Sequence, residues 1–351
     1  SLKQITIPSS VKSIGKSAFS KCSSLAQITI PSSVTSIGGK AFYECRSLTQ
    51  ITIPSSVASI RNDAFSNCSS LKKITIPSSV TSIEGNPFAF CESLKTIEID
   101  SENPKYVFKD GVLFTKDIQI LICYLSTNTR TTYDMPSTVT SIRNNAFSDC
   151  SLLTQITIPS SVTSIEGNPF VWCTSLKTIE IDSENPKYVF KEGVLFTKDI
   201  QILICYLSTN TRTTYDIPST VTSIRNYAFS ECSLLTQITI PSSVTSIGQH
   251  TFSQCSSLAQ ITIPSSVTSI GDSAFSGCNS FTQVTIPSSV TLIGDYAFSK
   301  CSSLTQITIP SSVTSIEGNP FVSCTSLKTI DVDSGNPKYV FKDGVLFTKD
   351  I

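Results

Sequence analysis

Three groups of residues in this 351-residue chain have types and spacings that could support chemistry at a site. Thirteen cysteines could form disulfides or bind zinc, and one histidine could act as a base or a metal ligand. Glu98, Asp100 and Glu102 alternate along one segment, as do Glu180, Asp182 and Glu184 in a second copy. Alternate side chains of an extended strand share a face, so each triplet could bind Ca²⁺; a solvated acidic turn is the alternative.

The cysteines follow a fixed step, which decides how they are interpreted. Neighbours in the series are 23 residues apart, except across two longer gaps. The series is Cys22, Cys45, Cys68, Cys91, Cys150, Cys173, Cys232, Cys255, Cys278, Cys301 and Cys324. One cysteine per repeat predicts a stacked column of buried free thiols, which behave as small apolar side chains; disulfides between neighbours are the alternative. Zinc is disfavoured because the chain has no CxxC, and His250 is expected to be a solvated loop residue.

The same step governs the whole chain. The motif ITIPSSV and its variants place prolines at a 23-residue spacing, with two gaps of 59 residues that equal one step plus 36. A fixed period in this range is typical of a solenoid, in which coils stack around one continuous core. We therefore predict a single solenoid over residues 1–351. Two repeats carry insertions at about 100–135 and 182–217, and a truncated third insertion covers about 333–351.

One repeat can be divided into segments by its residue types. Ile28 and Ile30 alternate with polar residues and predict a half-buried strand, which Pro31 ends because proline cannot donate to a ladder. Val34 and Ile37 point back to the core from a short extended segment. The unit AFxxC predicts one helical turn. These segments must position any functional side chain.

The skeleton IPxxVxxIGxxAFxxCxxL resembles the BspA-like leucine-rich repeat family. The resemblance is carried by Ile30, Pro31, Val34, Ile37, Ala41, Phe42, Cys45 and Leu48 and their copies. It implies a right-handed leucine-rich repeat solenoid with a parallel β-sheet on the concave face, short helical turns on the convex face and β-hairpin insertions. It also implies a surface or secreted protein of mucosal bacteria or parasitic protists. Some members of the family act as adhesins.

The outward positions of the predicted strands form polar columns, which are the candidate binding surface. Solenoids use such extended surfaces to bind partners, although Gln and Thr also simply keep an exposed sheet soluble. The candidate partner-binding residues are Gln27, Thr29, Gln50, Thr52, Lys73, Thr75, Glu98, Glu180 and Asp331. The insertions are a second candidate surface, and we expect Tyr106, Phe108, Lys109 and Asp110 to protrude from the edge of the solenoid.

Composition excludes several classes of function. Net charge is zero and charged residues make up 15% of the chain, which argues against a basic nucleic-acid surface. No apolar run approaches the roughly 20 residues of a membrane span. The chain has no P-loop, GxGxxG or HExxH motif, and we predict no catalytic, cofactor-binding or metal site. It opens and stops within a repeat, so we expect a fragment in which absent targeting signals carry little weight.

These observations favour a non-catalytic adhesion protein, at the cell surface or secreted, that binds an extracellular protein or glycan. The alternative is an intracellular protein-interaction scaffold, since free thiols suit a reducing compartment. An array of threonines could also bind ice or another regular polymer, but leucine-rich repeats curve and such a lattice requires a flat array.

Overall fold

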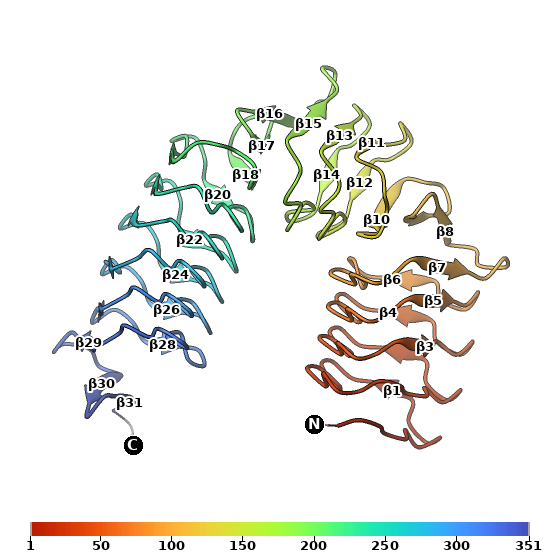
Figure 1. Ribbon diagram of the computed structural model, residues 1–351, viewed down its shortest axis with the longest axis horizontal. Coiled ribbons are helices and arrows are strands. Elements are labelled where there is room, and N and C mark those ends of the chain that lie inside the picture. The colour runs from red at the N-terminus through yellow and green to blue at the C-terminus, as the bar shows by residue number, and fades with distance from the viewer. Residues whose placement is uncertain (1, 350–351) are drawn as a thin grey trace. The chain divides into compact units, whose positions relative to one another are not determined.

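The computed structural model describes residues 2–349, and every element assigned there is a β-strand. The chain divides into two compact units, Ser1–Pro186 and Lys187–Ile351, each a stack of coils (Figure 1). Each coil contributes one strand to each of two parallel ladders, which we call the face ladder and the lateral ladder. The parallel solenoid predicted from the repeat is confirmed.

The face ladder contains the strands that end near the repeated proline. In the first unit they are β3 (Gln50–Thr52), β5 (Lys73–Ile76), β7 (Thr96–Ile99), β11 (Thr132–Asp134), β13 (Gln155–Ile158) and β15 (Thr178–Ile181). In the second they are β19 (Thr214–Asp216), β21 (Gln237–Thr239), β23 (Gln260–Thr262), β25 (Gln283–Val284), β27 (Gln306–Ile309) and β29 (Thr329–Val332). Equivalent residues pair in register, as Gln50 does with Lys73, so each sequence column becomes a column in space.

The lateral ladder is built from two-residue strands, nearly all with the sequence Ser-Ile. The first unit has β1 (Ser13–Ile14), β2 (Ser36–Ile37), β4 (Ser59–Ile60), β6 (Ser82–Ile83), β12 (Ser141–Ile142) and β14 (Ser164–Ile165). The second has β20 (Ser223–Ile224), β22 (Ser246–Ile247), β24 (Ser269–Ile270), β26 (Leu292–Ile293) and β28 (Ser315–Ile316). These confirm the short extended segment expected between the inward-pointing valine and isoleucine.

The insertions form the predicted hairpins. The first contains β8 (Tyr106–Lys109), β9 (Val112–Thr115) and β10 (Ile120–Tyr124), and the second β16 (Tyr188–Lys191), β17 (Val194–Thr197) and β18 (Ile202–Tyr206). The third contains β30 (Tyr339–Lys342) and β31 (Val345–Thr348). β8 and β9 pair antiparallel, and β10 then pairs parallel with β12, so the last strand of the insertion takes a place in the lateral ladder.

The first insertion also interrupts both ladders. The lateral sheet that starts at β1 ends at β6, and the next one begins in the insertion, so β6 and β10 are not paired. On the other side, one face sheet ends at β7 and the next begins at β11. Strand edges are therefore left unpaired inside the first unit, at the point where the repeat is broken.

The expected helical turn at AFxxC is wrong. Between residues 38 and 45, successive backbone amides donate alternately within the coil and to the next coil. Ala41 N–H donates back to Gly38 O, whereas Phe42 N–H donates to Ala64 O of the next coil at 2.7 Å. Lys40 and Glu44 have positive φ angles of 56° and 58°. A helix needs a continuous right-handed run whose amides all bond within it. Because alternate amides serve the neighbouring coil, the segment is a series of stacked turns.

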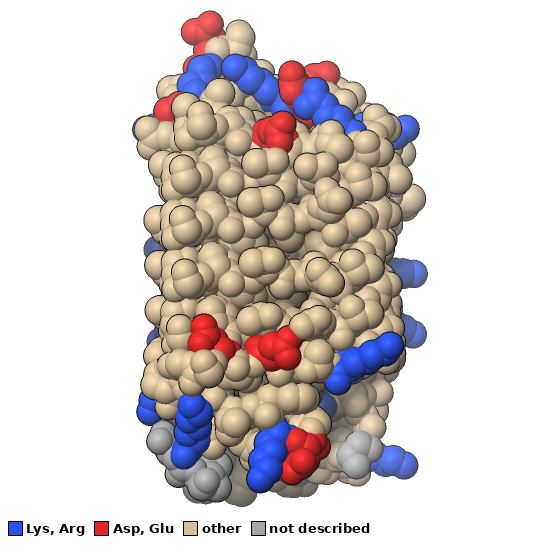
Figure 2. Space-filling model, turned by 90° about the vertical axis from the view of Figure 1, so that its left-hand side faces the viewer, with Lys and Arg blue, Asp and Glu red and all other residues tan. Residues whose placement is uncertain are grey.

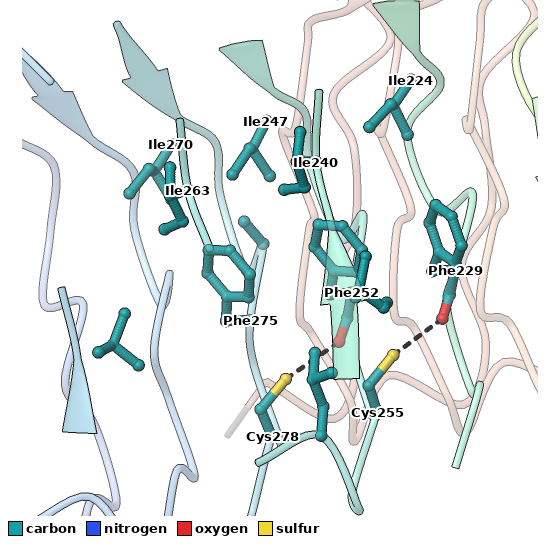
Figure 3. Close-up of a cluster of buried hydrophobic side chains, with 14 of the residues drawn as sticks. Ile224, Phe229, Ile240, Ile247, Phe252, Cys255, Ile263, Ile270, Phe275 and Cys278 are labelled. Atoms are coloured by element: carbon teal, nitrogen blue, oxygen red, sulfur yellow. Dashed lines mark hydrogen bonds between the residues drawn. The ribbon is translucent and has the colours of Figure 1, made fainter. Parts of the chain in front are cut away.

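The repeated apolar residues form the core of each unit. Their side chains point inward from successive coils, and the phenylalanines lie in one column (Figure 3). The rings of Phe42 and Phe65 stack with centroids 5.4 Å apart and planes within 3°. Phe65 stacks in turn on Phe88 at 5.9 Å. The core is thus continuous along the stack, because each coil covers the apolar surface of the one before it.

The cysteine column is confirmed as a column of free thiols. None of the thirteen cysteines, all of which lie among the described residues, forms a disulfide, and only Cys22 and Cys324 are less than fully buried. Each thiol in a regular coil donates to the phenylalanine carbonyl of the preceding coil, as Cys255 Sγ does to Phe229 O at 3.0 Å and Cys278 Sγ to Phe252 O at 3.2 Å (Figure 3). A small side chain with a weak donor fits this position, which explains its repetition.

We expect the native thiols to be unreactive. Burial raises the pKa of Cys45 and Cys301 to about 12, so almost no thiolate, the reactive form, is present at neutral pH. Reaction with an aromatic disulfide reagent should be at least about tenfold slower in the native protein than in urea. Cys22 and Cys324, which are partly exposed, should react first. Rapid native labelling of Cys255 or Cys278, mapped by mass spectrometry, would contradict this.

Candidate partner-binding surface

The face strands place one set of side chains in the core and the other on the surface. In β5 the isoleucines are buried and Lys73 and Thr75 are exposed, as period-two alternation requires. All nine residues predicted to line the binding surface are exposed. They are Gln27, Thr29, Gln50, Thr52, Lys73, Thr75, Glu98, Glu180 and Asp331. The pattern therefore predicted their exposure correctly, and a role in binding remains a proposal.

The face columns are mostly uncharged. Gln and Thr fill them in the coils between the insertions, for example at Gln237 and Thr239, and at Gln260 and Thr262, in the second unit. The scarcity of charge is visible in Figure 2, where uncharged side chains cover the middle of the face and Lys, Arg, Asp and Glu gather toward its ends. A surface of this kind offers a partner hydrogen bonds rather than a strong electrostatic field.

In the first unit, charged side chains enter the column at β5 and β7. Lys73 Nζ lies 2.6 Å from Glu98 Oε1, and Thr75 Oγ1 donates to Glu98 Oε2 at 3.2 Å. The hydrogen bond from Lys73 is the main cause that lowers the pKa of Glu98. In the second unit, Asp331 accepts a hydrogen bond from Gln306 of the preceding coil. The carboxylates are thus held in place by neighbours in the same face.

The structure argues against a Ca²⁺ site at the alternating carboxylates. β7 ends at Ile99, so Glu98 lies on the strand face but Asp100 lies in the following turn. Asp100 accepts the Glu102 N–H at 3.0 Å and the Ser78 N–H at 3.4 Å, and the first of these is the main cause that lowers its pKa. Between residues 2 and 349 no group of three His, Cys, Asp or Glu side chains is placed to hold a metal. Asp100 and its neighbours thus form an acidic turn closed by backbone hydrogen bonds.

Sequence reasoning missed two members of the face column. Thr132 and Asp134 of β11 pair in register with Gln155 and Thr157, and Thr157 Oγ1 donates to Asp134 Oδ1 at 2.7 Å. The second insertion repeats the arrangement at β19. The signal was present, because Pro136 aligns this segment with the other repeats, but the sequence TYDMP lacks the isoleucines that mark the other strands.

The insertions differ from the prediction at Tyr106, which does not protrude. Its side chain is buried, and its hydroxyl accepts the Ile83 N–H at 2.7 Å. Phe108 is half-buried, whereas Lys109 and Asp110 are exposed as expected. Tyr106 therefore fastens the hairpin to the preceding coil, since it replaces the strand partner that β6 lacks.

Two other residues with distinctive chemistry lie outside the face column. Trp172, the only tryptophan, is 40% exposed and packs against Phe90 with ring centroids 5.2 Å apart. His250 is half-buried and stacks on Tyr227 with centroids 4.5 Å apart, so it is not a solvated loop residue. A stacked, half-buried histidine stabilises its turn.

Two parallel ladders, in which equivalent residues of successive coils form columns, and hairpin insertions between coils define a leucine-rich-repeat solenoid with an extended polar face. The family described as BspA type leucine rich repeat region (6 copies) matches residues 1–111, 122–197 and 198–328. These ranges cover most of the chain, and the chain belongs to this family. Membership suggests a protein-binding role rather than an enzymatic one.

Solved structures give the same result. A leucine rich cell surface protein from Faecalibacterium prausnitzii is 34% identical, with a TM-score of 0.56 over 95% of this chain and 79% of that protein. The pneumococcal vaccine antigen PcpA is 22% identical, with a TM-score of 0.50 over 98% of this chain and 82% of that protein. The second likeness concerns the fold alone. No curated protein sequence matches this chain. Over residues 2–349 the structure contains no helix long and apolar enough to cross a membrane.

Proposed function

We propose that this protein is a non-catalytic binding protein, displayed at a cell surface or secreted, that contacts host or other extracellular macromolecules. The observation that carries the proposal is the set of polar columns on the face strands, in which outward side chains of successive coils stack within each sheet. Many weak hydrogen bonds along such a column can add up to specific binding without any one dominant residue. The Faecalibacterium protein, described as a cell surface protein, supports the location.

An intracellular interaction scaffold is the second candidate. The observation that favours it is the set of thirteen free cysteines, because a reducing compartment keeps thiols unpaired. Burial of the thiols weakens this argument, since a buried thiol is protected from oxidation in either compartment.

A pull-down distinguishes the two. The protein is immobilised and exposed in parallel to extracellular-matrix and secreted host proteins and to a cytosolic lysate. Saturable capture from the extracellular set, competed by free protein, is the expected result. Capture from the cytosolic lysate alone would favour the scaffold, and capture from neither would overturn a partner-binding role for these residues.

The charged positions of the face column provide a variant test. Glu98→Gln, Glu180→Gln and Asp331→Asn together should weaken binding to the captured partner about tenfold, because each exposed charge contributes roughly 0.2–1 kcal/mol. The matched control removes three carboxylates near the lateral ladder with Glu84→Gln, Glu166→Gln and Glu317→Gln. Equal binding of both variants in a surface-plasmon titration would place the contact away from the face.

A further inference from the structure

The break in the lateral ladder at the first insertion forms a cavity with its own chemistry. The cavity has a volume of about 620 Å³. Its lining comes from β6, the two hairpin strands and the coil that follows. The lining residues are Thr81, Ser82, Ile83, Pro104, Lys105, Tyr106, Thr115, Lys116, Asp117, Ile120 and Arg143. All of them belong to the first compact unit.

Three cations line this cavity, and only Arg143 has a carboxylate at contact distance. Lys116 N–H donates to Lys105 O at 2.8 Å, so the two residues lie opposite each other beyond the paired ends of β8 and β9. Both side chains are exposed, and among the described residues no carboxylate lies within 4 Å of either ammonium. Like charges directly opposite in a sheet repel. An anion between them would relieve that repulsion.

Arg143 supplies the third cation and also lines the cavity. Its side chain is 26% exposed and pairs with Glu166 through one terminal nitrogen. Its Nε is buried and has no hydrogen-bond partner in the described chain, which is costly. The exposed part of the guanidinium is the part that a ligand in the cavity can contact.

The only acidic residue lining the cavity is already occupied. Asp117 Oδ1 accepts from Thr115 Oγ1 at 2.6 Å and from Gln119 N–H at 3.2 Å. The first of these hydrogen bonds is the main cause that lowers the pKa of Asp117. Asp117 is thereby committed to closing its own turn and does not neutralise the lysines at contact distance.

The same cavity presents groups that suit hydroxyls. In regular coils the isoleucine carbonyl of the lateral strand accepts an N–H from the next coil, as Ile60 O does from Glu84 N at 3.0 Å. β6 is the last strand of its sheet, and in the part of the chain described here no N–H donates to Ile83 O. This unused carbonyl, together with the neighbouring hydroxyl of Ser82, can hydrogen-bond to ligand hydroxyls.

From these observations we propose that this cavity, which we call the seam cavity, binds an acidic sugar residue carrying a carboxylate or a sulfate. Lys105, Lys116 and Arg143 would hold the anionic group, and Ile83 O and Ser82 would bind ring hydroxyls. The volume lies within the range of small-ligand sites. The proposal rests on the proposed function and deepens it, because it names the partner class as an acidic glycan.

Glucuronate is the probe, and glucose and inorganic sulfate are its comparisons in a calorimetric titration. The test variant changes Lys105 and Lys116 to Gln. The control variant changes Lys95 and Lys109 to Gln, which are exposed in the same part of the chain and give the same net charge. All four are surface lysines, so both variants should fold, which circular dichroism checks.

Glucuronate should bind the native protein and the control variant with equal affinity, and the test variant at least tenfold more weakly. Glucose should bind at least tenfold more weakly than glucuronate. Equal binding of glucuronate to both variants, or binding of glucose as tight as glucuronate, would overturn the proposal. Sulfate binding as tight as glucuronate would show an adventitious anion patch and overturn the sugar assignment. If a protein partner is captured and neither the test variant nor excess glucuronate weakens it, the proposed function stands and this inference fails.

Discussion

Phe65→Ala should destabilise the first unit by about 3–5 kcal/mol, the range for truncating a fully buried phenylalanine. The ring of Phe65 is entirely buried, and it stacks on Phe42 at 5.4 Å and on Phe88 at 5.9 Å. Its removal opens a cavity in the column and takes one stacking partner from each neighbouring ring, although Phe42 keeps its contact with Phe19. A urea unfolding curve followed by circular dichroism should show a lower unfolding midpoint for the variant than for the native protein.

The control for this variant is Tyr296→Ala. Tyr296 is an aromatic residue of a turn in the second unit, and it is 40% exposed. Because 40% of its surface already contacts water, truncation should cost less than about 1 kcal/mol. A Phe65→Ala effect as small as the control would mean that the column can collapse around the missing ring, or that its coils unfold independently.

The repeat made most of this fold predictable from the sequence. Isoleucine alternation before the proline defined the face strands, and the phenylalanine and cysteine spacing defined the core columns, because identical residues at one step must stack when coils repeat. The helical turn was mispredicted for a physical reason. Residues such as Lys40 adopt positive φ because their amides bond to the next coil, and a local pattern of Ala, Phe and Cys does not report that long-range bond.

The candidate site was predictable in its exposure and not in its details. Period-two alternation places Gln27 or Thr52 on the surface whichever partner binds there. The seam cavity was beyond reach, because it depends on β6 and β10 failing to pair. That failure follows from where the hairpin enters the stack. Lys105 and Arg143 are 38 positions apart in sequence, and no local motif brings them together.

Asn103 is the residue in the insertion whose importance the sequence concealed. It follows the acidic turn, in a polar segment that reads as a loop, yet its side chain is buried. Its Nδ2 donates to Pro77 O at 2.8 Å and Val80 O at 3.1 Å. Its Oδ1 accepts the Lys105 and Tyr106 N–H groups at 2.9 and 3.0 Å. One amide therefore ties the entrance of the hairpin to the corner of the preceding coil.

The third insertion repeats this arrangement with the same geometry. Asn336 Nδ2 donates to Pro310 O at 2.8 Å and Val313 O at 3.1 Å, and its Oδ1 accepts the Lys338 N–H at 2.9 Å. Aspartate could not replace either residue without cost, because a carboxylate has no N–H to donate to the two carbonyls. The requirement is for an amide, which has both a donor and an acceptor.

Asn103→Ala should therefore destabilise the first unit by about 2–6 kcal/mol, because the buried Val80 O and Tyr106 N–H lose their partner at roughly 1–3 kcal/mol each, whereas Pro77 O keeps the Val80 N–H and water can reach Lys105. In a hydrogen-exchange experiment, the amides of β8 and β9 should lose protection first, before those of the coils that precede them.

Asn128→Ala is the matched control. Asn128 bridges Asp110 O and Arg130 N–H in the same insertion, but at a solvent-exposed position, so water can replace it at about 1 kcal/mol or less. Asn103→Asp tests the donor and the acceptor of the amide separately. It keeps the acceptor for the Tyr106 N–H, but it places a carboxylate oxygen against the Pro77 and Val80 carbonyls. If that variant were as stable as the native protein at neutral pH, the two donor bonds would contribute nothing and the hairpin would be held by Tyr106 alone.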